Sequence, residues 1–195
     1  MKTNKYIIFS SLLLISSLPL EVQAHTGIGS VNGLVNGLLH PLIGVDHLLV
    51  MLAIGLWATI LDKTALWLLP TTFLIAMTFG ALLNFNGLSF STAENWVAFS
   101  VLVLGALVWR NTYMSSTLAI TLVAVFAVSH GYVHGDELGN TSDSLIYSLG
   151  FLFTTLLLHC LGVTIGLLKT VHLKIINACF GMVCTVVGIS LLIGT

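Results

Sequence analysis

The chain has 195 residues, of which 57% are hydrophobic and 7% are charged, and its formal net charge is −1. A soluble domain carries about 25% charged residues, so this chain cannot cover a water-exposed surface. The composition, with a mean hydropathy of +1.07, predicts an integral membrane protein, and the lack of a basic excess argues against nucleic acid as a partner. The three cysteines lie in apolar runs without a zinc or redox spacing and are interpreted as core side chains.

Residues 1–24 have the pattern of a secretory signal peptide. Lys2 and Lys5 precede an apolar stretch, and Val22-Gln23-Ala24 supplies the small-residue cleavage pattern. Cleavage there leaves residues 25–195 as a single transmembrane domain with an N-terminus on the periplasmic side; a retained first anchor is the alternative. The Gly- and Asn-rich stretch 25–39 is expected to be a short surface or re-entrant segment, with a solvated His25 at its start.

Six apolar runs follow, each near the roughly 20 residues that a membrane span needs. They are expected at residues 41–61, 64–83, 95–113, 115–134, 145–168 and 174–194. Glycine and alanine recur in these runs, and small residues let helices approach closely in lipid. The predicted fold class is therefore all-α, a polytopic helix bundle of about six spans. Because the first and fourth runs both carry histidines, an inverted repeat of three plus three spans is a further hypothesis.

The charged residues predict the orientation of these spans. With the N-terminus outside, the loops after the first, third and fifth runs face the cytoplasm, and they carry every basic residue of the mature chain: Lys63, Arg110, Lys169 and Lys174. The outer loops carry only acidic residues, namely Glu94, Asp136, Glu137 and Asp143. This positive-inside pattern predicts a bacterial inner-membrane protein with both termini in the periplasm. Asp62, Glu94 and His172 lie at span ends and are interpreted as interfacial.

A first cluster of ionisable residues opens the run at 41–61. Pro41 suits the first position of a helix, so His40 is expected at the membrane surface and His47 about 10 Å deeper. On such a helix His40, His47 and Met51 share one face with Gly44. Asp46 points about 100° away from His47 and either binds an ion from another angle or orients a histidine. Ionisable residues inside a membrane mark functional sites by default, although hydrogen bonds between helices are the alternative.

A second cluster lies at the end of the fourth run. His130 and His134 are four residues apart and share a helical face, which Glu137 continues if the helix persists. Two histidines at this spacing can bind one metal ion; solvated histidines at a loop edge are the alternative. The predicted topology puts both clusters at the same depth on the outer side. His159, in the fifth run, is interpreted either as a deeper relay point or as a hydrogen-bonding residue between helices.

Imidazole and carboxylate ligands suit Ni²⁺, Co²⁺ or Zn²⁺, whereas Cu⁺ prefers thiolate or thioether. The residues therefore predict a transporter of divalent metal ions with its site on the outer side. The chain has no nucleotide-binding loop, so transport is expected to be passive, ion-coupled or driven by the membrane potential. A membrane metalloenzyme, for which no acid–base motif is present, and a non-transporting accessory or metallochaperone protein are the alternatives; an enzyme is not expected.

These residues resemble the HupE/UreJ family, membrane accessory proteins of hydrogenase and urease systems that carry nickel or cobalt. The motifs that match are His40-Pro41-x-x-Gly44-x-Asp46-His47, His130-Gly131-Tyr132-x-His134-Gly135-x-Glu137, and Gly150-Phe151 through Leu158-His159 to Gly162. The chain departs from the family at Ser129 and Val133, where Phe and Ala are frequent, and it has only His25 in place of a longer His-rich tract.

The resemblance implies uptake of Ni²⁺ or Co²⁺ into the cytoplasm for metalloenzyme assembly, with Zn²⁺ left open as a substrate. It implies hydrogenase or urease maturation proteins as partners besides the lipid bilayer, and it leaves a homo-oligomer open. Carried over residue by residue, the candidate metal ligands are His40, Asp46, His47, His130, His134, Glu137 and His159.

Overall fold

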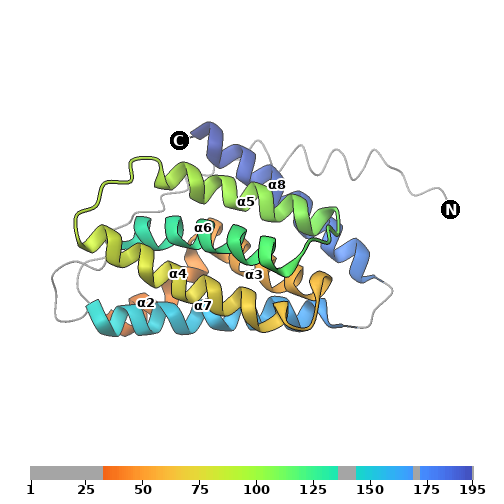
Figure 1. Ribbon diagram of the computed structural model, residues 1–195, viewed down its shortest axis with the longest axis horizontal. Helices are drawn as coiled ribbons and strands as arrows, with labels where there is room; N and C mark the ends of the chain where they lie inside the picture. The colour runs from red at the N-terminus through yellow and green to blue at the C-terminus, as the bar shows by residue number, and fades with distance from the viewer. Residues whose placement is uncertain (1–32, 136–143, 169–171, 195) are drawn as a thin grey trace.

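A computed structural model describes residues 33–135, 144–168 and 172–194, and the regular elements within these ranges are all α-helices. The predicted signal peptide, His25 and Glu137 lie outside the described residues. The helices are α2 (Gly33–Ile43), α3 (Val45–Leu61), α4 (Ala65–Phe85), α5 (Ala93–Trp109), α6 (Ser116–Gly135), α7 (Ser144–Gly166) and α8 (Leu173–Gly194). Most of the long helices, α4 to α7, run roughly along the long axis of the bundle (Figure 1).

The predicted apolar runs correspond to the apolar helices of the bundle. Four helices, α4, α6, α7 and α8, are each long and apolar enough to cross a membrane, and α2 with α3 qualifies as one bent span. Helix α5 is apolar but shorter, with 17 residues. The predicted class, a polytopic helical membrane protein, is confirmed, while the number of six spans stays a prediction.

The first run begins differently from its prediction. Helix α2 starts at Gly33 and contains Pro41, so Pro41 is not the first helical residue. Residues 33–39 are helical and form part of a bent helix pair, which is compatible with the re-entrant alternative. The chain then breaks at Gly44, whose ψ of 109° is extended, and the axes of α2 and α3 differ by 73°. The prediction that His40, Gly44 and His47 share one helical face is therefore wrong.

Packing against α7 explains the early start of α2. The two backbones touch at Gly37, where an added Cβ would lie 2.1 Å from the carbonyl oxygen of Tyr147. Further along α7, the Thr154 hydroxyl donates to the Leu38 carbonyl of α2 at 2.9 Å. These contacts depend on α7, which is more than 100 residues away in the sequence, so local sequence signals could not predict them.

Glycines bring three further pairs of helices into backbone contact. An added Cβ at Gly55 of α3 would lie 2.3 Å from the His159 carbonyl of α7, and one at Gly80 of α4 would lie 2.0 Å from the Val128 carbonyl of α6. An added Cβ at Gly105 of α5 would lie 2.8 Å from the backbone nitrogen of Thr185 on α8. Because no side chain of the glycine separates these helices, the predicted role of small residues in helix packing is confirmed at these positions.

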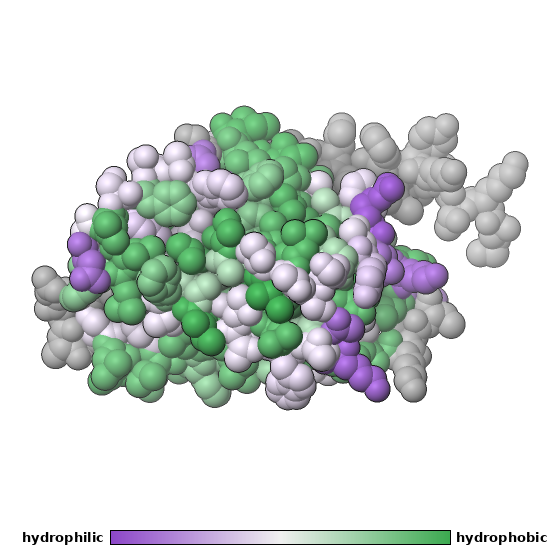
Figure 2. Space-filling view, in the orientation of Figure 1, coloured by the Kyte–Doolittle hydropathy of each residue, from purple (hydrophilic) through white to green (hydrophobic). Residues whose placement is uncertain are grey.

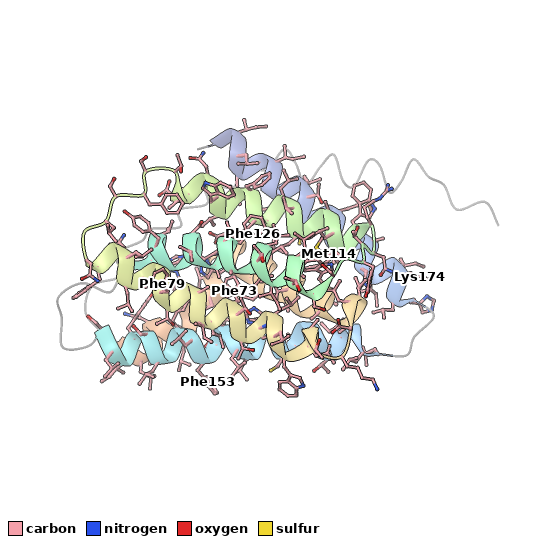
Figure 3. The ribbon with its side chains drawn as sticks, viewed as in Figure 1. Phe73, Phe79, Met114, Phe126, Phe153 and Lys174 are labelled. Carbon is pink, nitrogen blue, oxygen red and sulfur yellow. The ribbon has the colours of Figure 1, made fainter. Side chains whose placement is uncertain are left out.

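The surface of the bundle is predominantly apolar. Figure 2 shows hydrophobic side chains over most of this face, with strongly hydrophilic ones gathered mainly at the end where α8 begins, near Lys174, which Figure 3 labels. Large apolar side chains point outward, among them Trp67 at 78% and Ile193 at 81% exposure. In water this surface would be strongly unfavourable, so the exposed faces are suited to lipid.

Two of the connections that carry basic residues lie side by side at that end. Asp62, between α3 and α4, accepts hydrogen bonds from the Thr64 and Ala65 N–H groups at 2.8 Å and from the Ser116 hydroxyl at the start of α6. These hydrogen bonds, that from Ser116 first, lower the pKa of Asp62 to about 2. Nearby, the Trp57 indole donates to the Thr112 carbonyl at 2.9 Å.

Gly80→Ala is expected to lower the free energy of unfolding by about 1–3 kcal/mol, because the new methyl group forces α4 away from α6. Gly194→Ala is the control, since an added Cβ there meets no atom within 4 Å among the described residues. Thermal unfolding of both purified variants in detergent measures the difference. Equal melting temperatures would show that the contact between α4 and α6 is not as tight as described.

Asp62→Asn is expected to reduce stability at neutral pH by weakening this hydrogen-bonded connection. A lowered pKa means that ionised Asp62 stabilises the folded protein fully above its ordinary pKa of 3.8, and that this contribution is lost as the pH falls towards about 2. The melting temperatures of wild type and variant should therefore converge in acid. If the difference between the two melting temperatures stayed constant down to about pH 2, ionised Asp62 would not be the stabilising group.

Candidate metal centre

Four imidazole rings meet where α2, α3 and α6 come together. The ring centroids of His47 and His134 are 4.3 Å apart, those of His47 and His130 are 4.8 Å apart, and His40 lies 4.8 Å from His134. The two histidine motifs, which are more than 80 residues apart in the sequence, thus form one cluster. This proximity is what the matching depth of the two motifs predicted.

The break at Gly44 helps to position this cluster. Its bend lets His40 on α2 and His47 on α3 approach with ring centroids 6.0 Å apart, although they belong to different helices. On α6 the predicted spacing holds, because the helix is continuous through His130 and His134 to Gly135. His47 and His130 are completely buried, and His134 is 7% exposed.

Aromatic side chains form the walls of the cluster. The Phe151 ring of α7 lies 5.4 Å from both His40 and His47 and 5.5 Å from His134. On the other side, Phe73 of α4, which Figure 3 shows in the middle of the bundle, lies 5.6 Å from His130. Such walls keep water away from the imidazoles, and they strengthen electrostatic interactions inside the cluster.

Asp46 lies at the start of α3, next to His47. Its Oδ1 atom accepts a hydrogen bond from the His47 backbone N–H at 2.9 Å and lies 3.5 Å from the His47 Nδ1 atom. The first contact satisfies one of the free N–H groups at the helix start. The second is within ion-pair distance but is not a hydrogen bond. The carboxylate therefore supports the helix and adds negative charge beside the cluster.

Among the described residues, His159 has no recorded ring contact with the four clustered histidines, but it contacts Phe73. The Phe73 centroid is 5.3 Å from the His159 centroid, so one aromatic ring contacts both His130 and His159. The His159 Nδ1 atom is 2.8 Å from the Thr155 carbonyl oxygen. A carbonyl oxygen only accepts hydrogen bonds, so Nδ1 carries the proton and Nε2 has the lone pair.

Several nitrogen atoms of these rings are buried without a hydrogen-bond partner among the described residues. They are Nδ1 and Nε2 of His47, Nδ1 of His130 and Nε2 of His159. Buried polar atoms of this kind are costly and call for an explanation such as a bound ion. Within the described ranges, however, no three His, Cys, Asp or Glu side chains are arranged closely enough to form a finished metal site.

The structure thus brings four of the predicted ligands, His40, His47, His130 and His134, into contact, with Asp46 at the edge. His159 is separate, and Glu137 lies outside the described residues. Three further residues contact a candidate histidine and were not predicted as site residues: Phe73, Ser100 and Phe151. Ser100 had a visible signal, as a hydroxyl inside an apolar run, and Phe151 lies in the third matching motif; nothing local distinguishes Phe73.

The helix bundle and the buried imidazole cluster together define a polytopic membrane protein whose interior holds a cluster of side chains of a kind that can bind metal ions. The family model described as HupE / UreJ protein matches residues 12–191. "Protein HupE" of Rhizobium leguminosarum bv. viciae is 36% identical over 165 residues, which cover 85% of this chain and 86% of that protein. No solved structure matches the chain. The chain belongs to the HupE/UreJ family.

Asp46→Asn is expected to keep the hydrogen bond of residue 46 to the His47 backbone and to remove the negative charge beside the His47 ring. The amide oxygen can still accept from the His47 N–H, so the folded protein should reach the membrane at a normal level, whereas the negative charge is gone. We expect Ni²⁺ affinity to fall about 10–100-fold, as is typical when a group that supports a ligand is removed. Calorimetric titration of the purified full chain in detergent measures this.

Asp46→Ala is the companion variant, and it should also lose about 1 kcal/mol of stability because the hydrogen bond at the helix start is removed. If Asp46→Asn bound Ni²⁺ with wild-type affinity, the role of Asp46 would be limited to stabilising the first turn of α3.

Proposed function

We propose that this protein is a permease that carries Ni²⁺ or Co²⁺ through the inner membrane into the cytoplasm, for the assembly of a metalloenzyme such as hydrogenase or urease. Membership of the HupE/UreJ family supports a role connected with nickel or cobalt. The proposed ligands at the outer side are His40, Asp46, His47, His130, His134 and Glu137, and His159 is the proposed deeper contact.

The observation that carries the proposal is the contact between the two histidine motifs inside an apolar bundle. The His47 and His130 rings are both fully buried, and nitrogen atoms of both have no hydrogen-bond partner among the described residues. Histidines that served only to pack helices would be expected to pair these atoms with neighbouring groups. Imidazole nitrogens beside a carboxylate match the ligand preference of Ni²⁺, Co²⁺ and Zn²⁺.

His159 is the proposed next contact on the way inward. Its lone pair is on Nε2, and the Phe73 ring contacts both it and His130. Inward movement of a divalent cation is favoured by about 4.6 kcal/mol at a potential of 100 mV. This corresponds to roughly thousandfold accumulation at equilibrium, so the proposed transport requires no nucleotide hydrolysis.

Uptake of radioactive nickel in cells tests the proposal, with cobalt and zinc as competitors and membrane levels checked for each variant. We expect His47→Ala and His130→Ala to reduce uptake to the empty-vector level, because each removes a central ligand. His159→Ala is expected to reduce uptake at least about tenfold. His172→Ala is the matched control, since it removes an exposed histidine in the turn before α8 and should leave uptake unchanged.

Other outcomes would favour the alternatives. Nickel and cobalt uptake by the wild type at the empty-vector level would contradict transport. Metal binding by the purified protein without uptake would favour a non-transporting accessory or metallochaperone protein. A metal-dependent reaction in the same preparation would favour a membrane metalloenzyme. Uptake lost equally in His172→Ala would show that the assay reports folding rather than the cluster.

A further inference from the structure

A buried serine on α5 contacts the imidazole cluster from outside it. The Ser100 Oγ atom lies 2.9 Å from the His130 Nε2 atom and 2.6 Å from the carbonyl oxygen of Val97, one turn earlier on the same helix. Ser100 and His130 are both completely buried. Among the described residues, Ser100 is the one hydrogen-bond partner recorded for the His130 ring.

The Val97 carbonyl, the Ser100 hydroxyl and the His130 ring form a series of contacts, and the chemistry of the carbonyl determines where the protons lie. A serine hydroxyl has one hydrogen, and the Val97 carbonyl can only accept, so the Ser100 hydrogen points to Val97. The Ser100 oxygen can then only accept from His130, and the His130 Nε2 atom must carry a proton. In a neutral imidazole the other nitrogen, Nδ1, therefore has the lone pair.

We infer that Ser100 is a positioning residue, which holds His130 in the tautomer that offers Nδ1 to a metal ion. This inference rests on the proposed function, since it takes His130 as a ligand. The His130 Nδ1 atom is buried and unpartnered within the described part of the chain, and the His130 ring lies 4.8 Å from the His47 ring. Metal-ligating histidines regularly donate their second N–H to a nearby acceptor, which fixes the ring and its tautomer.

His159 has a corresponding arrangement with the opposite nitrogen. Its Nδ1 atom donates to the Thr155 carbonyl, which leaves the Nε2 lone pair without a partner among the described residues. The backbone performs this role for His159, whereas His130 depends on a side chain from another helix. A mutation of Ser100 can therefore remove the hydrogen bond of the His130 ring without changing the histidine itself.

The first test compares Ser100→Ala with Ser100→Thr in the full chain. Ser100→Ala removes the acceptor and leaves a buried N–H unpaired, so the apparent Ni²⁺ affinity and the uptake efficiency are expected to fall about 10–100-fold at normal membrane levels. Ser100→Thr keeps the hydroxyl, which can bond the same helix carbonyl, and should restore most of the loss. Ser129→Ala is the matched control, since Ser129 is a buried serine whose recorded bond goes to Val125 of its own helix.

A double mutant distinguishes positioning from packing. If Ser100 acts through His130, the variant with both Ser100→Ala and His130→Ala should bind Ni²⁺ no more weakly than His130→Ala alone. An additional loss in the double mutant would assign Ser100 to packing and overturn the inference. The absorption spectrum of bound Co²⁺ gives an independent readout, because a changed ligand atom should shift it in Ser100→Ala and not in Ser129→Ala.

The two proposals can fail separately. Wild-type protein that neither binds nor transports nickel or cobalt contradicts the proposed function itself. Normal nickel binding and uptake in Ser100→Ala, together with loss in His130→Ala, overturns only the role of Ser100. The role of Ser100 is also overturned if Ser100→Thr fails as completely as Ser100→Ala while both proteins fold and reach the membrane.

Discussion

Direct contact between helix backbones is the constraint on which the rest of this structure depends. Glycine on α3 meets α7, and glycine on α4 meets α6, with no side chain between them. These contacts determine how the helices are aligned along their axes, and therefore which side chains of neighbouring helices lie beside one another. Phe73 of α4, for example, contacts His130 on α6, the helix that the glycine contact holds against α4, and it also contacts His159 on α7.

Inside such a bundle each polar hydrogen atom needs an acceptor, because the low dielectric makes unpaired groups costly. The histidines meet this requirement in part: His159 donates to a backbone carbonyl, and His130, in the tautomer inferred above, donates to Ser100. What remains on each ring is a lone pair, which is what a metal ion requires. The same hydrogen bonds that make the imidazoles tolerable in the membrane thus leave them suited to a cation.

Much of this could be predicted from local patterns. The six apolar runs predicted the long helices, and the four-residue spacing of His130 and His134 predicted their common face on α6. The start of the first run could not be predicted in this way. Pro41 is favoured at the first turn of a helix, but contact between Gly37 and Tyr147 of α7 stabilises an earlier start. The break at Gly44 also changed which residues share a face with His47.

Sequence alone therefore determined the class of the protein, the positions of its apolar helices, its family and the histidines that come together. The class and the helix positions follow from composition and hydrophobic runs, the histidine positions from motif spacing, and the family from the resemblance of those motifs to known proteins. Only the tertiary structure decided the 73° bend between α2 and α3, the aromatic walls of Phe73 and Phe151, and the contact of Ser100 with His130. Each of these depends on residues from separate helices, and their distances are set by how closely the backbones pack.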